Sequence, residues 1–177
     1  MNENNIWTRG SIHGDEYYTL EKTANIIAHN MIHIPHLKIW CPFNDADSVW
    51  GGVLMKHGFD AICTETDFFV TDPPEGCNAI VSNPPFSIKQ EIMDRTKELK
   101  IPFVYILPFT WMNDGIPFEY GHQVMFFRKR MHFRTESNDL NKPRSNCFVL
   151  SNGLLKRDMT VIWDEVGDAQ YRIQTRI

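Results

Sequence analysis

The stretch Ala79-Ile80-Val81-Ser82, followed directly by Asn83-Pro84-Pro85-Phe86, decides the fold of this chain. Its apolar first half is typical of a buried strand in a parallel sheet. Residues at the carboxyl end of such a strand project into the crevice where open α/β sheets bind ligands. We therefore expect the tetrad from Asn83 to Phe86 to lie at a ligand site.

The chemistry of this tetrad suits an amino group attached to an aromatic ring. Asn83 offers a side-chain carbonyl and Pro84 a main-chain carbonyl, and proline restricts the backbone of both residues. Two acceptors of this kind can hold the two N–H groups of an exocyclic amine, while Phe86 offers a face for stacking worth about 1–3 kcal/mol per base. The alternative is a simple strand terminator, because Asn-Pro commonly opens a turn.

The tetrad resembles the signature (Asp/Asn/Ser)-Pro-Pro-(Tyr/Phe/Trp) of the DNA adenine N6-methyltransferases. The run from Asp15 to Phe86 is further similar to small methyltransferase-like proteins of bacteriophages and prophages, and the resemblance extends over roughly residues 15 to 150. It implies methyl transfer from S-adenosylmethionine to the N6 amine of adenine, most simply in DNA. The catalytic residues that it implies are Asn83, Pro84, Pro85 and Phe86.

The loop from Cys41 to Asp47 stands where the family has Asp-Pro-Phe-x-Gly-x-Gly. Pro42 and Phe43 are kept, but Cys41 replaces the acid and the glycines are missing. The resemblance implies that Asp45 or Asp47 reaches the ammonium of the methionine moiety. Alternatively, these acids only favour the start of a helix.

Further donor-binding residues are implied after the second expected strand and near the N-terminus. Asp67 and Phe68 are similar to the family's acid and aromatic that contact the donor's adenine, and Glu65 is placed to bind ribose hydroxyls. Strand-end acids and a core Phe are the alternative. The full set of cofactor-binding residues is Tyr18, Thr19, Cys41, Pro42, Phe43, Asp45, Glu65, Asp67 and Phe68.

The segment from Asp15 to Thr19 resembles the family's N-terminal motif, whose Tyr and Thr contact the carboxylate end of the donor. Tyr17 and Tyr18 could instead form a hydrophobic staple ahead of a helix. Phe133 is similar in placement to the aromatic that covers the other face of the target base.

Basic residues concentrate between residues 128 and 144, where aromatic residues are interleaved with them. This composition is typical of a groove that follows a nucleic-acid backbone and stacks bases, although a solvated strand-loop-strand region has the same composition. The expected substrate-binding residues are Phe86, Phe133, Arg128, Arg130 and Arg134. Lys129, Lys142 and Arg144 belong to the same basic cluster.

Helical and strand patterns alternate along the chain, which predicts a Rossmann-like α/β fold with a mostly parallel, doubly wound sheet and an antiparallel edge. Only about ten residues separate Asp67 from the strand at 78–82, so we expect the sheet to be shortened there. Expected helices cover 17–33, capped by Thr19, and 46–57 and 88–99. Expected strands cover 37–40, 60–64, 78–82 and 102–107, with antiparallel strands at 124–127, 147–150 and 159–163.

Composition sets broad limits on the protein. A chain of 177 residues with 42% hydrophobic content predicts one globular domain over 1–177 without a separate target-recognition domain. Neither a signal peptide nor a membrane span is expected, so we predict a cytoplasmic protein, in the host cytoplasm if it is phage-encoded. The four cysteines are widely spaced, which predicts reduced and mostly buried thiols. His29, His33 and His36 favour packing or solvated roles over a metal site, and no metal is expected.

A net charge of −4 argues against a general nucleic-acid coat but is compatible with one local basic patch. The expected partner is nucleic acid, with DNA favoured over RNA. Either the protein acts with low sequence specificity, or a homodimer or a host protein partner supplies target recognition. Two alternatives stay open. One is a non-catalytic module of the same fold that binds nucleic acid or a protein partner, and the other is an enzyme that methylates adenine in RNA or glutamine in proteins.

Overall fold

Seven strands form one central sheet in the computed structural model, which describes residues 17–44, 48–114, 116–134, 140–141 and 146–162. Their order across the sheet is β10-β6-β9-β5-β4-β2-β3. The strands are β2 (Lys38–Pro42), β3 (Asp60–Thr64), β4 (Ala79–Ser82), β5 (Phe103–Pro108), β6 (Gln123–Phe127), β9 (Cys147–Ser151) and β10 (Met159–Ile162).

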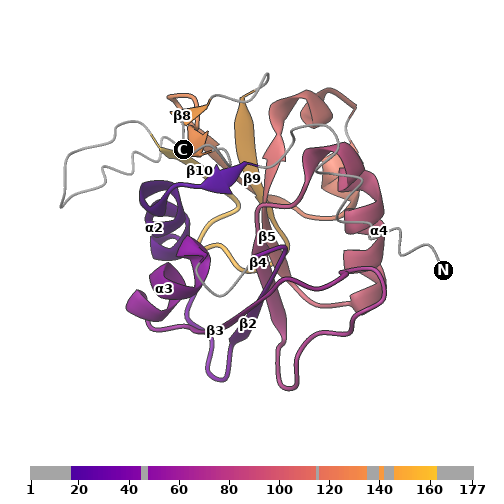
Figure 1. Ribbon diagram of the computed structural model, residues 1–177. Helices are drawn as coiled ribbons and strands as arrows, with labels where there is room; N and C mark the ends of the chain where they lie inside the picture. The colour runs from indigo at the N-terminus through magenta and orange to yellow at the C-terminus, as the bar shows by residue number, and fades with distance from the viewer. Residues whose placement is uncertain (1–16, 45–47, 115, 135–139, 142–145, 163–177) are drawn as a thin grey trace.

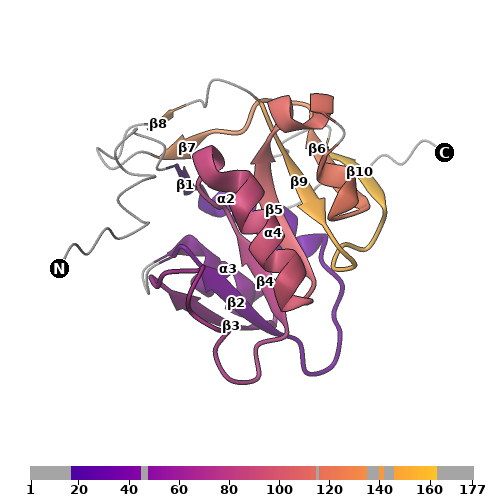
Figure 2. The same cartoon turned by 90° about the vertical axis from the view of Figure 1, so that its right-hand side faces the viewer.

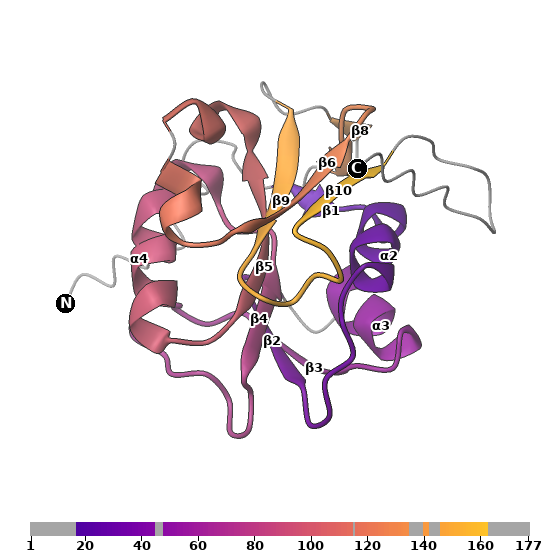
Figure 3. The same cartoon turned by 180° about the vertical axis from the view of Figure 1, so that it is seen from behind.

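Helices cover both faces of this sheet, as Figures 1 and 3 show from opposite sides. Helices α2 (Glu21–His29) and α3 (Val49–Lys56) pack together on one face, and α4 (Lys89–Leu99) covers the other. Side chains alternate between the two faces along each strand. Ile39 and Val81 therefore belong to the core under α2 and α3, whereas Trp40 and Ile80 belong to the core under α4. The expected doubly wound α/β architecture is confirmed.

Strand β4 is buried at every residue, because it lies between β2 and β5 and has helices on both faces. Ile80 pairs with Trp40 on one side and Phe103 on the other, both in parallel register. A strand buried on both faces reads as a continuous apolar run, which is why the sequence predicts it well.

The sheet is shortened at the β3 edge, as the sequence predicted. The connection of residues 65–78 between β3 and β4 contains turns but neither a helix nor a strand. Strand β3 is therefore the last strand on this side of the sheet within the described ranges. The Arg95 guanidinium on α4 holds this connection through an ion pair with Asp72 at 3.3 Å.

The antiparallel part of the sheet is smaller than expected. Strand β9 is antiparallel to both β5 and β6, but β10 pairs with β6 in parallel register. Strands β6 and β10 therefore run in the same direction as β5, and the prediction that all three late strands form an antiparallel edge was wrong. Strand β9 lies between β5 and β6 and runs opposite to both, so β6 has the same direction as β5. No local sequence pattern indicates that β9 takes this place in the sheet.

The helix predicted for residues 17–33 is shorter at both ends. Tyr18–Thr19 forms a short strand, β1, which pairs antiparallel with β7 (Phe133–Arg134), and β7 pairs with β8 (Leu140–Asn141). The N-cap of α2 is Leu20, with extended backbone, so Thr19 is not the cap. Beyond α2, Met31 forms an isolated antiparallel β-bridge with Leu155, so the chain is no longer helical there.

The remaining boundaries follow the sequence closely. Helix α3 begins at Val49, where the Ser48 hydroxyl accepts a hydrogen bond from the Trp50 amide at 3.4 Å, while 45–47 lie outside the described residues. Three 3-10 segments cover Phe86–Ile88 (η1), Phe109–Asp114 (η2) and Ile116–Glu119 (η3). Within the described ranges, no helix combines the length and the apolar character needed to cross a bilayer.

Gly121 allows a close approach between the segment before β6 and the end of β9. A Cβ atom placed on Gly121 would lie 2.6 Å from the Ser151 carbonyl oxygen and 3.2 Å from Leu150 Cγ. Since the nearest atom belongs to paired backbone, we expect Gly121→Ala to reduce the free energy of unfolding by about 1–3 kcal/mol.

A matched control is Gly52, which lies in α3 and has no atom within 4 Å of an added Cβ. Gly52→Ala should raise the free energy of unfolding by about 0.5–1 kcal/mol through helix propensity. Urea denaturation of both variants measures the two effects, and equal stability of the two alanine variants would contradict the close approach.

Candidate functional site

The carboxyl ends of four neighbouring parallel strands meet at one edge of the sheet. Phe43 follows β2, Glu65 follows β3, Asn83 follows β4 and Phe109 follows β5. Open α/β sheets bind their ligands at this edge. Figures 1 and 2 show β1 on the same side of the molecule, above the ends of the central strands. The sequence-predicted tetrad and donor loop are thus on a common edge.

Asn83 is held in one orientation by the main chain of a distant residue. Its side-chain Nδ2 donates to the carbonyl oxygen of Tyr17 at 2.5 Å, across 66 positions of sequence. Because a carbonyl can only accept, this contact fixes which end of the Asn83 amide carries the oxygen. The Asn83 Oδ1 atom is buried and has no hydrogen-bond partner in the described structure. A buried acceptor without a partner costs about 1–3 kcal/mol, so this atom is a natural place for a ligand donor.

Aromatic rings gather beside Asn83. Tyr17 stacks against Phe86 with ring centroids 6.0 Å apart and an interplanar angle of 28°. Phe133 is fully buried and meets both rings edge-on, at 5.7 Å from Tyr17 and 6.5 Å from Phe86. The structure thus brings together Asn83, Phe86 and Phe133, although Phe86 and Phe133 are nearly perpendicular to each other rather than parallel. Pro84 is buried, and Pro85 is half-buried between it and Phe86.

The N-terminal motif reaches this cluster through strand pairing. Thr19 lies opposite Phe133 and Tyr18 opposite Arg134 in the β1–β7 ladder. Tyr18 is half exposed, whereas Thr19 is only 6% exposed and its buried Oγ1 has no hydrogen-bond partner in the described structure. A second buried polar atom without a partner therefore lies within the same strand pair as Phe133.

The loop after β2 is tied together by polar side chains. Phe43 has a left-handed backbone, with φ of 65°, although it is not a glycine. The Asn44 side chain donates to the Pro42 carbonyl at 2.7 Å and to the Ser82 hydroxyl at 2.8 Å, and it accepts from the Ser48 hydroxyl at 2.8 Å. The Asn44 side chain thus holds the loop's shape where the family has glycines, and these hydrogen bonds link the loop to the end of β4.

Cys41 lies under this loop in the hydrophobic core and is not exposed. Hydrogen bonding to the Cys63 thiol and burial raise the pKa of the Cys41 thiol well above its usual value. The thiol is therefore neutral at physiological pH and cannot replace the charge of the acid that the family carries here. Asp45, the other acid expected to bind the donor, lies outside the described residues, as does Asp47.

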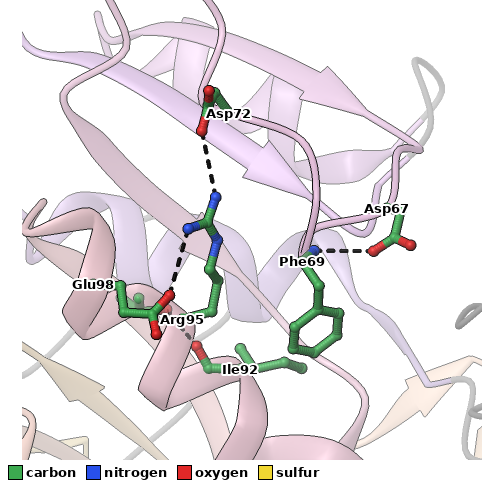
Figure 4. Close-up of polar contacts among 7 residues, drawn as sticks. Asp67, Phe69, Asp72, Ile92, Arg95 and Glu98 are labelled. Atoms are coloured by element: carbon green, nitrogen blue, oxygen red, sulfur yellow. Dashed lines mark hydrogen bonds and ion pairs between the residues drawn. The ribbon is translucent and has the colours of Figure 1, made fainter.

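Asp67 and Phe68 occupy the connection after β3. The Asp67 carboxylate accepts from the Phe69 amide at 2.9 Å, which closes a turn, and Figure 4 shows this contact close to α4. Phe68 is 1% exposed and lies between Trp40 and Phe43, with ring centroids at 5.5 and 5.0 Å. Phe68 thus packs as a core residue beneath the loop that bears Phe43.

Glu65 follows β3 directly, and its side chain is exposed at the carboxyl edge. The neighbouring Thr64 hydroxyl accepts from the Trp40 indole at 2.7 Å, which fixes the end of β3 against β2. The register of β3 with β2 thus places Glu65 beside the residue that follows β2.

The expected substrate-binding arginines are exposed. Arg128 and Arg130 follow β6, and Arg134 ends β7 opposite Tyr18. Lys142 and Arg144 lie outside the described residues. The basic cluster therefore spans the end of β6 and the strand pair that carries the N-terminal motif.

The histidines of the N-terminal region have packing contacts. His33 stacks on Phe59 with centroids 4.4 Å apart, and His29 meets His57 edge-on at 6.4 Å. Burial, followed by the neighbouring histidines, lowers the pKa of His57. Among the residues that the structure describes, no three His, Cys, Asp or Glu side chains are grouped so as to hold a metal ion.

Three residues of this site were missed by sequence reasoning. They are Tyr17, through its main-chain carbonyl, and Asn44 and Ser82, through their side chains. Polar residues at the ends of β2 and β4 were a usable signal for the last two. Tyr17 was noted as part of the N-terminal motif, but its contact with Asn83 gave no signal in the sequence because it uses the backbone.

The fold and the site together define a doubly wound α/β protein with buried acceptors at the carboxyl edge of its sheet. No protein-family model matches the chain, and no curated protein matches it. Among solved structures it is similar to the crystal structure of the 23S rRNA methyltransferase ErmE, with a TM-score of 0.48 and 13% sequence identity. That alignment covers 80% of this chain and 70% of ErmE. A likeness of this size carries no inference about function.

The orientation of the Asn83 amide can be tested by a substitution that replaces its Nδ2 group by an oxygen. In Asn83→Asp an oxygen replaces the Nδ2 group that faces the Tyr17 carbonyl, so we expect a loss of about 1–3 kcal/mol of unfolding free energy at neutral pH. At acidic pH the protonated carboxyl can donate to Tyr17, and the loss should shrink. Urea denaturation at neutral and acidic pH measures both values.

Asn78→Asp is the matched control, because the exposed Asn78 side chain also donates to a carbonyl, that of His36 at 3.0 Å. Solvent should weaken the repulsion there, so the control should lose less stability. If Asn83→Asp were as stable as the wild type at neutral pH, the proposed amide orientation would be wrong.

Proposed function

We propose that this protein transfers a methyl group from S-adenosylmethionine to the N6 amine of adenine, with DNA as the substrate. The observation that carries the proposal is the buried Oδ1 of Asn83, an acceptor that lacks a partner and is fixed in orientation by Tyr17. The tetrad that contains it resembles the motif of adenine N6-methyltransferases and lies where α/β sheets bind ligands.

In the proposed reaction, the chain's own residues orient the amine. Asn83 Oδ1 accepts one N–H of the amine and the Pro84 carbonyl accepts the other, which directs the nitrogen lone pair away from the base ring. Phe86 stacks on the base with the part of its ring that Tyr17 does not cover. A base in a duplex would have to leave its helix to reach such a pocket, at a cost of a few kcal/mol that stacking offsets in part, whereas an unpaired base is spared most of that cost.

One structural observation supports binding of the methyl donor by the residues of this site. Thr19 Oγ1 is a buried polar atom without a partner, and the resemblance assigns this residue to the donor's carboxylate end. Glu65 would hold the ribose hydroxyls, and the Asp67 oxygen that does not close the turn would accept from the donor's adenine. When bound, the donor supplies a methyl group already activated by its positive sulfonium, so the protein's task is alignment and exclusion of water.

A second candidate function is a module that binds nucleic acid without modifying it. It is favoured by the donor side of the site, where the Cys41 thiol is neutral and Asn44 is fully engaged in holding its loop. Calorimetric titration with S-adenosylmethionine separates the two functions. Absence of donor binding by the folded protein would favour the binding module.

Asn83→Ala tests the proposed catalytic role. We expect loss of methyl transfer by about 100-fold or more, because the amine is no longer held in line, with donor affinity unchanged. Asn152→Ala is the control, since Asn152 is exposed at the opposite edge of the sheet. Transfer of labelled methyl to DNA, RNA and protein in parallel measures activity and identifies the substrate. Full activity of Asn83→Ala would contradict the assignment.

Asp67 is tested by a pair of variants. Asp67→Asn keeps an oxygen to accept from the Phe69 amide but removes the charge, whereas Asp67→Ala also opens the turn. We expect both variants to bind the donor more weakly than the wild type in calorimetric titration, with Asp67→Ala the weaker of the two. If Asp67→Asn and Asp67→Ala both bound the donor as the wild type does, Asp67 would have no part in the donor site.

A further inference from the structure

Phe109 is an exposed aromatic ring at the carboxyl edge that the proposed chemistry does not use. It follows β5 directly, next to the strand that carries the tetrad, and its side chain is 40% exposed. Its backbone amide donates to the Asn146 carbonyl at 2.6 Å, which ties the residue to the start of β9. The position of Phe109 is therefore fixed by the main chain.

The ring of Phe109 is supported from below by two other aromatic residues. Phe126 on β6 lies 6.0 Å from it and Phe148 on β9 lies 6.1 Å from it, both measured between ring centroids. Phe148 is fully buried, so the three rings form a continuous cluster from the core to the surface. An aromatic ring that is backed in this way can present its exposed part to a ligand with little loss of conformational freedom.

Positive charge lies next to this ring. Arg128, Lys129 and Arg130, here called the basic segment, are exposed and begin two residues after Phe126. The Arg128 amide donates to the Ile162 carbonyl at 3.0 Å, which anchors the segment to the end of β10. Burial raises the pKa of the Cys147 thiol to about 12, and the positive charge of Arg130 opposes that rise. Asn146, the partner of Phe109, is the residue before Cys147.

We propose that Phe109 and the basic segment bind a single strand of nucleic acid beside the target adenine, with one base on the Phe109 ring and its phosphates on Arg128 and Arg130. This inference rests on the proposed function and specifies its substrate as single-stranded. A base in a duplex has both faces covered by its neighbours, so an exposed ring gains a stacking partner only from an unpaired base.

The net charge of the protein favours contact with a few nucleotides of the strand rather than with a long stretch of it. With a net charge of −4, the chain as a whole does not attract phosphates, so attraction must come from local basic groups. Stacking and a few phosphate contacts are the combination by which proteins hold single strands.

The test measures binding without the methyl donor, by fluorescence anisotropy with a labelled adenine-containing oligonucleotide of about 16 nucleotides. Single-stranded DNA, single-stranded RNA of the same sequence and duplex DNA are compared at several salt concentrations. We expect both single strands to bind more tightly than the duplex, and the tighter of the two identifies the sugar. Tighter binding to the duplex would overturn the proposal.

Two variants have different expected signatures. Phe109→Ala should lower single-strand affinity by about 5- to 150-fold and leave the salt dependence unchanged. Substituting Arg128 and Arg130 together by Gln should reduce the slope of log affinity against log salt by about 0.7 for each phosphate that the protein no longer neutralises. If Phe109→Ala bound the single strand as tightly as the wild type, the proposal would be wrong.

Controls on the opposite side of the molecule complete the test. Met55→Ala removes another exposed apolar side chain, 62% exposed on α3, and Lys100→Gln removes a positive charge at the end of α4. Both variants should bind as the wild type does, and Phe109→Tyr should retain binding because it keeps the ring. Since no donor is present, loss of the proposed methyl transfer and loss of strand binding are separate results.

Discussion

The pairing of β4 on both of its edges is the constraint on which the site depends. A strand buried on both faces and hydrogen-bonded on both sides can end only where its backbone is allowed to leave the ladder. Pro84 and Pro85 lack the amide N–H that a ladder requires, so the chain leaves the sheet immediately after Ser82. Ser82 in turn donates to the Pro42 carbonyl at 2.6 Å, which locks the end of β4 to the neighbouring loop. The tetrad is therefore presented by a rigid core.

The N-terminal segment contributes as much to the tetrad as the core does. Pairing of β1 with β7 brings Tyr17 over Phe86 and sets its carbonyl against Asn83. One short strand thus couples the amide orientation of Asn83 to the position of Phe133. By contrast, the loop after β2 is held by Asn44 and by the left-handed Phe43, without the glycines that the resemblance implies. The tetrad therefore matches the pattern that the sequence resembles more closely than the loop after β2 does.

Sequence reasoning succeeded where burial alone decides structure. The apolar runs predicted β3, β4 and β5 to within a residue or two, and the short connection after Asp67 correctly predicted the reduced edge. It failed where distant backbone contacts decide. The β1–β7 ladder joins residues more than a hundred positions apart, and the parallel direction of β10 is set by the insertion of β9. Phe109 and the contact of the Tyr17 carbonyl with Asn83 were missed for the same reason, because their neighbours come from other parts of the chain.

The reduced sheet also bears on how the protein behaves in concentrated solution. Strand β3 has a partner on one side only, β2, within the part of the chain that the structure describes. An open strand edge is a template for adding a strand from another molecule, and proteins counter this with short edges and charge. Here the edge strand is five residues long and begins at the exposed Asp60. The short length of β3 and the carboxylate at its start therefore disfavour the addition of a strand from another molecule at this edge of the sheet.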